Sequence, residues 1–292
     1  MKIQTMSIVC GTTACNARCP YCVSRTTPST QLSTQVNWKN LDVACRLAER
    51  SGATTCLITG KGEPTLYPDL ITSYLYRIRK YFPLIELQTN AIRIGDGSLD
   101  RIGTPNDLID PISYLGKWID HGLTTIAISA VSWKRESNQM IYGEEYPELA
   151  MVCDKLHRIG YSIRLSVIMI KNCIDTPLAV AELIDFARAM GIEQLTIRSV
   201  RAPENGSGKE VEWIRSNRVD AETNGINEYL RVYATEVLRL PHGAIVYDFD
   251  GQNICLANCL TTNETTENMR QIIFYPSGMI SYDWKYAGAR LL

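Results

Sequence analysis

The feature that most limits the fold is a regular alternation of strand-like and helix-like patterns over the first two-thirds of the chain. Short runs rich in Ile, Val, Leu and Thr are typical of buried strands, and apolar residues at helical spacing follow them. The strand-like runs lie at 3–10, 54–59, 85–89, 124–130, 162–170 and 194–200, and helical patterns lie near 40–52, 68–81, 107–121, 146–159 and 177–190. Strands that alternate with helices predict a parallel α/β architecture.

The number of these units favours an incomplete barrel. Six units are fewer than the eight of a complete (β/α)8 barrel. A doubly wound sheet is less favoured, because no glycine-rich dinucleotide turn follows the first run. The sequence therefore predicts an α/β fold, a partial (β/α)6 TIM-like barrel, over residues 1–202.

The pattern changes in the last third of the chain. Residues 202–220 are rich in Pro, Asn, Gly and Ser, which predicts a linker or long loop. A helix is expected around 222–239, followed by two hairpins at 245–256 and 272–284, which turn at Asp250-Gly251 and at 276–278. We expect residues 203–292 to form a small C-terminal α+β appendage.

Composition excludes several classes of protein. The 292 residues are 45% hydrophobic and 21% charged, as in ordinary globular proteins. The net charge is −1, so nothing in the overall charge attracts nucleic acid. No apolar run approaches the roughly 20 residues of a membrane span, and the start lacks the apolar core of a secretory signal. We expect a soluble cytoplasmic protein with neither a membrane nor a nucleic acid as partner.

The ten cysteines need a chemical explanation, because four of them crowd into residues 10–22. Without a secretory signal a disulfide framework is not expected. Cys15, Cys19 and Cys22 form a C-x3-C-x2-C pattern directly after the first strand. Three thiolates on one loop can hold three corners of an iron–sulfur cube and leave one iron open to a ligand. The alternatives are a zinc site completed by Cys255 and Cys259, or packing thiols without metal.

The segment CNARCPYC at 15–22, placed after the first strand of about six βα units, resembles the radical S-adenosylmethionine superfamily. The resemblance implies that Cys15, Cys19 and Cys22 bind a 4Fe–4S cluster whose open iron chelates the amino and carboxylate groups of S-adenosylmethionine. It also implies that an electron, supplied by a donor such as flavodoxin or ferredoxin, reductively cleaves S-adenosylmethionine to methionine and a 5′-deoxyadenosyl radical. Tyr21, the aromatic residue before the last cysteine, would lie near the adenine.

Three further segments resemble weaker elements of the same superfamily. ITGKGEPTL at 58–66 resembles its Gly-Gly-Glu segment: Gly62 and Glu63 match, Lys61 stands where glycine is commoner, and Gly60 is expected to take over the close approach to the cofactor. Glu63 would accept a hydrogen bond from the cofactor ammonium. Asn90, which follows the third strand, and Ser129, which ends the fourth, are expected to contact the cofactor, Ser129 at its ribose.

Side-chain alternation also predicts a polar barrel interior. The apolar face of each strand must meet the helices, which turns Glu86, Arg164, Ser166 and Arg198 inward. Buried charges cost several kcal/mol unless they are paired or solvated, so we expect a wide interior filled by ligand. Arg164 and Arg198 suit carboxylate or phosphate groups, including the cofactor carboxylate, and Ser166 lies on the same cofactor-binding face. The alternative is an internal pair between Glu86 and one of these arginines.

The pattern ICLANC at 254–259 resembles the SPASM-type or twitch extensions that carry an auxiliary cluster in some members of the superfamily. Two cysteines supply fewer than the four ligands that such a cluster normally uses. We therefore expect an appendage without a cluster, with Cys255 and Cys259 as packing thiols or as a pair that faces the substrate.

These observations predict an enzyme that abstracts hydrogen from a small anionic metabolite, such as a nucleotide or sugar nucleotide. No residue beyond the cofactor-binding set is assigned a catalytic role. The alternatives are modification of a peptide or protein, including activation of a glycyl-radical enzyme, and a non-enzymatic iron–sulfur or zinc-binding scaffold. A peptide-modifying enzyme would be expected to carry a leader-recognition domain before the first strand.

Overall fold

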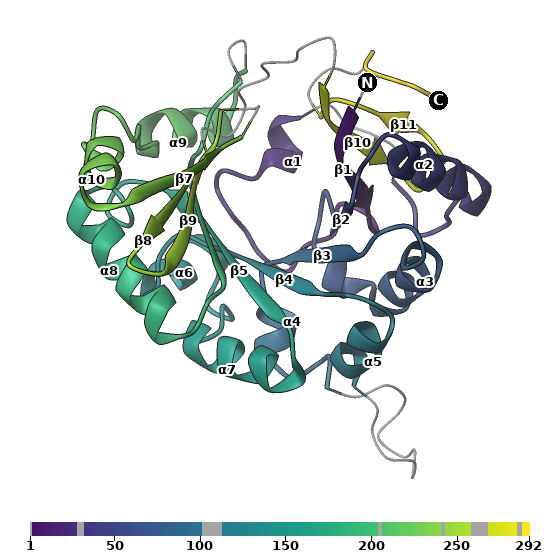
Figure 1. The fold of residues 1–292 in the computed structure, drawn as a ribbon, viewed down its shortest axis with the longest axis horizontal. Helices are drawn as coiled ribbons and strands as arrows, with labels where there is room; N and C mark the ends of the chain where they lie inside the picture. Colours follow the sequence, from purple (N-terminus) through teal and green to yellow (C-terminus); the bar gives the residue numbers. More distant parts are fainter. Residues whose placement is uncertain are drawn as a thin grey trace.

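In the computed structural model, the described residues form a curved sheet of 11 strands (Figure 1). The structure describes residues 2–27, 32–100, 113–203, 206–240, 243–257, 268–284 and 288–292. The first six strands are β1 (Lys2–Val9), β2 (Thr55–Thr59), β3 (Leu84–Thr89), β4 (Thr125–Ala130), β5 (Ser162–Met169) and β6 (Gln194–Ser199). Each is parallel to the next, which confirms the predicted α/β fold with a partial TIM-like barrel.

The helices lie on the outside of this sheet, except for α1, which lies on its concave side (Figure 1). They are α1 (Val23–Thr26), α2 (Trp38–Arg50), α3 (Pro68–Ile78), α4 (Ile92–Gly95), α5 (Tyr114–Asp120), α6 (Arg135–Tyr142), α7 (Leu149–Ile159), α8 (Pro177–Ala189), α9 (Lys209–Asn217) and α10 (Ile226–Tyr233), with a 3-10 turn η1 (Pro64–Leu66). Local sequence fixes their ends: Thr176 caps α8 by accepting from Ala179 N, and Gly160 ends α7 with a positive φ.

The two faces of the sheet differ as the alternation predicts. Ile85, Leu87, Ile128 and Leu165 point toward the helices and are 0–1% exposed. The opposite face carries polar side chains such as Gln88 and is partly exposed. The main core therefore lies between the sheet and the helices, and part of the opposite face is accessible to solvent.

The C-terminal strands extend the same sheet at both of its ends. They are β7 (Thr235–Arg239), β8 (Ile245–Phe249), β9 (Gln252–Ala257), β10 (Asn268–Phe274) and β11 (Ile280–Ser281). Both predicted hairpins are present, as β8–β9 and β10–β11. In addition, β9 pairs in parallel with β6, and β10 pairs in parallel with β1. The division of the chain into domains at residues 202 and 203 stays a prediction.

Two expectations for this region were wrong in detail. The predicted linker at 202–220 contains helix α9, which buries Val211 and Ile214. The helix expected at 222–239 ends at Tyr233, and strand β7 follows it. Every residue of β7 is exposed, so its side chains carry no apolar–polar alternation that would mark a strand. Of the helix expected near 107–121, residues 107–112 lie outside the described part, and α5 occupies the rest.

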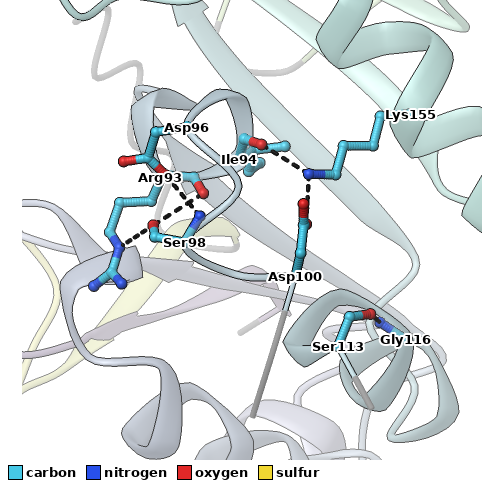
Figure 2. Close-up of polar contacts among 8 residues, drawn as sticks. All are labelled: Arg93, Ile94, Asp96, Ser98, Asp100, Ser113, Gly116 and Lys155. Atoms are coloured by element: carbon cyan, nitrogen blue, oxygen red, sulfur yellow. Dashed lines mark hydrogen bonds and ion pairs between the residues drawn. The ribbon is translucent and has the colours of Figure 1, made fainter. Parts of the chain in front are cut away.

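Polar contacts hold residues 92–100, which follow β3 in the chain, against α7. Figure 2 shows Lys155 of α7, whose Nζ donates to the carbonyl of Ile94 at 3.0 Å and forms an ion pair with Asp100 at 2.5 Å. Arg93 Nε donates to Ser98 Oγ at 2.7 Å in the same segment. These contacts fix the chain just after the polar end of β3, which belongs to the candidate site described below.

Within the described ranges, none of the helices combines the length and the apolar character needed to cross a lipid bilayer.

Candidate functional site

The three clustered cysteines lie on the loop that leaves the carboxyl end of β1, the end where (β/α) barrels build their active sites. Cys15 is exposed, and Cys19 and Cys22 are partly exposed. The loop is held by backbone hydrogen bonds, from Cys22 N to the carbonyl of Cys19 at 3.2 Å and from Arg18 N to the carbonyl of Tyr142 at 3.0 Å. All three thiols are thus presented by one anchored loop.

The thiols are close enough to interact electrostatically. Burial raises the pKa of Cys19 to about 12, and the neighbouring Cys22 and Cys15 add to this rise. Thiolates that repel one another are stabilised when they bind a cation, and the thiolate is the form that ligates metals. A cation bound by the loop would offset this repulsion between its thiolates.

The donor set fits a 4Fe–4S cluster with one open iron. Among the residues that the structure describes, no three His, Cys, Asp or Glu side chains are arranged to hold a single metal ion. In an iron–sulfur cube each thiolate binds a different iron, so the three sulfurs need not converge on one point. Cys15, Cys19 and Cys22 would provide three of the four protein ligands that such clusters normally use.

Asn90 lies beside the first cysteine. Its Nδ2 donates to Asn16 Oδ1 at 2.8 Å and lies 3.9 Å from Cys15 Sγ, while its Oδ1 accepts from Ile92 N at 3.0 Å. The next residue, Ala91, has a left-handed φ of 62°, a strained conformation for a residue with a Cβ. The structure thus brings a predicted cofactor neighbour, Asn90, into contact with a predicted cluster ligand.

Glu63 connects three elements of the site. Its buried carboxylate accepts from Thr65 N (3.0 Å), Thr65 Oγ1 (2.6 Å) and Thr89 Oγ1 (2.7 Å) at Oε1, and from Asn90 N (3.0 Å) at Oε2. Its backbone N donates to the carbonyl of Ala14 at 2.9 Å. Burial raises the pKa of Glu63, and the hydrogen bonds that it accepts oppose that rise. Oε2 keeps acceptor capacity, because a carboxylate oxygen has two lone pairs, so the expected contact with the cofactor ammonium stays a prediction.

Gly60 and Gly62 allow other atoms to approach their backbone closely. In the structure, backbone atoms of neighbouring loop residues occupy this space. A Cβ on Gly62 would lie 2.1 Å from the carbonyl oxygen of Ala14, and a Cβ on Gly60 would lie 3.1 Å from that of Gly62. Lys61 between them is 5% exposed, and its Nζ donates to Thr27 Oγ1 at 3.3 Å. Gly62 therefore lets the β2 loop pack on the cysteine loop, and Lys61 reaches the residue that follows α1.

Tyr21 is buried in an aromatic cluster. Its hydroxyl lies 2.7 Å from that of Tyr142, and its ring centroid lies 5.9 Å from that of Trp213 on α9. Sequence reasoning missed both partners, because nothing in the local pattern distinguishes them from other core aromatics. The proximity of Tyr21 to adenine stays a prediction.

The inner face of the sheet carries the remaining predicted residues. Ser129 pairs in register with Ser166, and Ser166 with Thr196. Arg164 forms an ion pair with Glu86, which confirms the alternative of internal pairing for this arginine.

Arg198 differs from Arg164. Both arginines have a buried Nε without a hydrogen-bond partner among the described residues, but Arg198, unlike Arg164, also has no ion pair within that part of the chain. Burial raises the pKa of the Tyr21 and Tyr142 hydroxyls, and the positive charge of Arg198 opposes this shift. The partly exposed guanidinium therefore lies near that hydroxyl pair, with no acidic partner in the described part of the chain.

The other cysteines are placed apart from the loop. Cys255 on β9 pairs in register with Thr196, so it shares the inner face, and Cys259 lies outside the described residues. Cys10 is fully buried in the core cluster between sheet and helices, where burial raises its pKa. The cluster-free appendage stays a prediction.

Comparison with family models decides the family. The model of the radical SAM superfamily matches residues 9–187, more than half of the chain, including the cysteine loop, Glu63 and Asn90. This chain belongs to the radical SAM superfamily. The superfamily uses a 4Fe–4S cluster and S-adenosylmethionine, in agreement with the donor set of the loop.

Solved structures of radical SAM proteins share the fold. SuiB of Streptococcus suis bound to S-adenosylmethionine is 15% identical with a TM-score of 0.60; the match covers 96% of this radical SAM chain and 60% of SuiB. The structure of anSMEcpe with bound AdoMet is 13% identical with a TM-score of 0.53, and the match covers 100% of this chain and 74% of anSMEcpe. The chain thus spans 60% of the length of SuiB. Comparison with curated proteins gave no match.

Proposed function

We propose that this radical SAM chain is an enzyme that abstracts a hydrogen atom from a small anionic metabolite, such as a nucleotide or sugar nucleotide. When bound, the reduced cluster and S-adenosylmethionine supply the 5′-deoxyadenosyl radical that accepts this hydrogen atom, with methionine as coproduct. A low-potential donor such as flavodoxin or ferredoxin supplies the electron. The protein's own task is to hold the cofactors and orient the substrate.

The residues around the cysteine loop divide this task. Cys15, Cys19 and Cys22 hold the cluster, and the amide of Asn90 orients Cys15. Glu63 fixes Asn90 by accepting from its backbone N–H, and it fixes the loop through its own N–H to Ala14. This network holds the cluster loop in one geometry before any substrate binds.

The observation that supports an anionic substrate is that Arg198 has no acidic partner in the described part of the chain. The Arg198 side chain is partly exposed, but its buried Nε has no hydrogen-bond partner in the described part of the chain, and a guanidinium bound to a carboxylate or phosphate gains charge-assisted hydrogen bonds. Arg164, the other arginine on the inner face, already pairs with Glu86. Arg198 therefore remains to bind the anionic group of a molecule that enters the concave side of the sheet.

The first test is production of 5′-deoxyadenosine. The protein is reconstituted anaerobically, reduced with dithionite and given S-adenosylmethionine with nucleotides and sugar nucleotides in turn. We expect one of these compounds to increase 5′-deoxyadenosine formation and, when deuterated, to transfer deuterium to it. SuiB, which shares the fold, was solved bound to its precursor peptide SuiA, so peptides form the second substrate class. Stimulation by peptides alone would overturn the metabolite proposal, and no product from protein with a full cluster would favour a scaffold.

Replacing Arg198 with Gln tests whether this side chain binds the anionic group of the substrate. We expect the KM for the anionic substrate to rise about 10–100-fold, because hydrogen bonds to charged groups contribute roughly 1.5–3 kcal/mol. The KM for S-adenosylmethionine should stay within about twofold, and Arg198→Lys should recover part of the loss. A rise in the KM for S-adenosylmethionine alone would instead assign Arg198 to the cofactor carboxylate.

A further inference from the structure

Helices α2, α3 and α5 lie on the outer side of the sheet (Figure 1), and they carry a second cluster of cationic side chains. A groove of about 410 Å³ runs between α3 and α5 and is bordered by the first residue of α2. Its wall includes Trp38, Ser73, Tyr76, Arg77, Lys117 and His121. None of these residues takes part in the radical SAM site.

The charged side chains that line this groove are all basic. Arg77 and Lys117 are cationic, His121 can become so, and none of the residues lining the groove is acidic. Neither Arg77 nor Lys117 forms an ion pair with a residue in the described ranges. Like charges gathered in one concavity raise the local concentration of anions.

The hydrogen-bonding groups of the groove are partly preorganised. The Arg77 guanidinium stacks 4.6 Å from the centroid of Trp38, whose ring packs edge-on against the buried Tyr74 at 5.4 Å. This stacking holds the plane of the guanidinium and leaves its N–H edges for an acceptor. His121 Nδ1 is buried and finds no hydrogen-bond partner in the part of the chain that the structure describes.

We propose that this groove binds a phosphate group, at a site separate from the radical SAM centre. A phosphate offers the several acceptor oxygens that a guanidinium, an ammonium and an imidazole can share. The side chain of Tyr76 is exposed and its ring lies 6.5 Å from that of His121, which provides an aromatic wall for the organic part of a phosphorylated molecule. The phosphate reaches the groove either free or as part of a small molecule such as a nucleotide.

The test is a binding titration of the reconstituted full-length chain, saturated with S-adenosylmethionine, followed by phosphorus NMR and calorimetry. Inorganic phosphate and AMP are the two probes. Both should bind in the wild type, and Arg77→Gln combined with Lys117→Gln should weaken binding at least ~10-fold, since two charged hydrogen bonds are lost. Tighter binding of AMP than of phosphate identifies the ligand as a phosphorylated molecule, and equal binding identifies free phosphate.

Arg50→Gln is the matched control, because it removes an exposed cation from the last residue of α2 and leaves the groove lining intact. Its affinity for both probes should stay within about twofold of wild type, since the groove supplies the binding. Thermal unfolding of the double variant should change little, because both side chains are partly exposed and only the stacking of Arg77 on Trp38, about 0.5–1 kcal/mol, is lost. No binding to the wild type, binding that the double variant keeps, or an equal loss of binding in Arg50→Gln would overturn the proposal.

Discussion

Replacing Cys19 with Ala is expected to remove both the iron–sulfur cluster and all formation of 5′-deoxyadenosine. The remaining Cys15 and Cys22 can bind only two of the four irons of a cube, and Cys10, the other thiol between β1 and α1, is fully buried in the core. The partly exposed Cys19 lies between the other two in sequence and interacts electrostatically with both. Iron and sulfide content, the visible absorption of the reconstituted protein and product formation measure the effect.

Cys255→Ala provides the matched control for this variant. Cys255 is also partly exposed, but it lies on β9 and pairs in register with Thr196. We expect this variant to keep about four irons and four sulfides per chain, because one cube is expected. Full iron content in Cys19→Ala would contradict the assigned ligand set, and a loss of half the iron in Cys255→Ala would indicate a second cluster.

Gly62→Ala is expected to give the second-largest effect, on both stability and cluster binding. The new Cβ would lie 2.1 Å from the Ala14 carbonyl oxygen and 2.7 Å from that of Thr12, so the backbone before Cys15 must move. Overpacking of this kind typically costs about 1–3 kcal/mol of unfolding free energy. Displacement of the loop should also lower the iron content after reconstitution. Chemical denaturation and iron analysis measure the two effects.

Gly60→Ala is the control that distinguishes the effect of overpacking at Gly62 from a general sensitivity of this loop to substitution. Its nearest contact would be 3.1 Å, so a shift of a few tenths of an ångström accommodates the methyl group. We expect a smaller loss of stability than for Gly62→Ala, and nearly normal iron content. Equal effects of the two variants would show that the contact with residues 12–14 does not set the loop geometry.

The sequence predicted the barrel well because its strands are short buried runs with clear helices between them. The positions of β1 to β6 follow from local periodicity alone. The places where the C-terminal hairpins join the sheet could not be predicted, since β9 pairs with β6 and β10 with β1 over long sequence separations. A hairpin pattern identifies only the strand next to it, and its second neighbour depends on the tertiary fold.

In the candidate site too, contacts within one loop could be predicted from the sequence, whereas contacts between distant segments could not. The spacing of Cys15, Cys19 and Cys22 was enough to predict a cluster ligand set, because all three belong to one loop. The contact between Asn90 and Cys15 spans 75 residues, and the contact between Tyr21 and Tyr142 spans 121. No local pattern encodes such pairs.

The two inward arginines were also indistinguishable from sequence. Arg164 and Arg198 both occupy polar positions on strands with similar alternation. Their difference arises because β3 brings Glu86 within reach of Arg164, across the intervening strand β4. Only the folded sheet shows that Arg164 is neutralised and Arg198 is not.

The central claim is that three cysteines leave one iron of the cluster open to S-adenosylmethionine. Electron paramagnetic resonance of the dithionite-reduced protein, recorded with and without S-adenosylmethionine, tests this most directly. We predict the signal of a reduced 4Fe–4S cluster whose g-values shift when S-adenosylmethionine is added, because the cofactor ligates the open iron. An identical spectrum from a fully loaded cluster in both samples would contradict the claim.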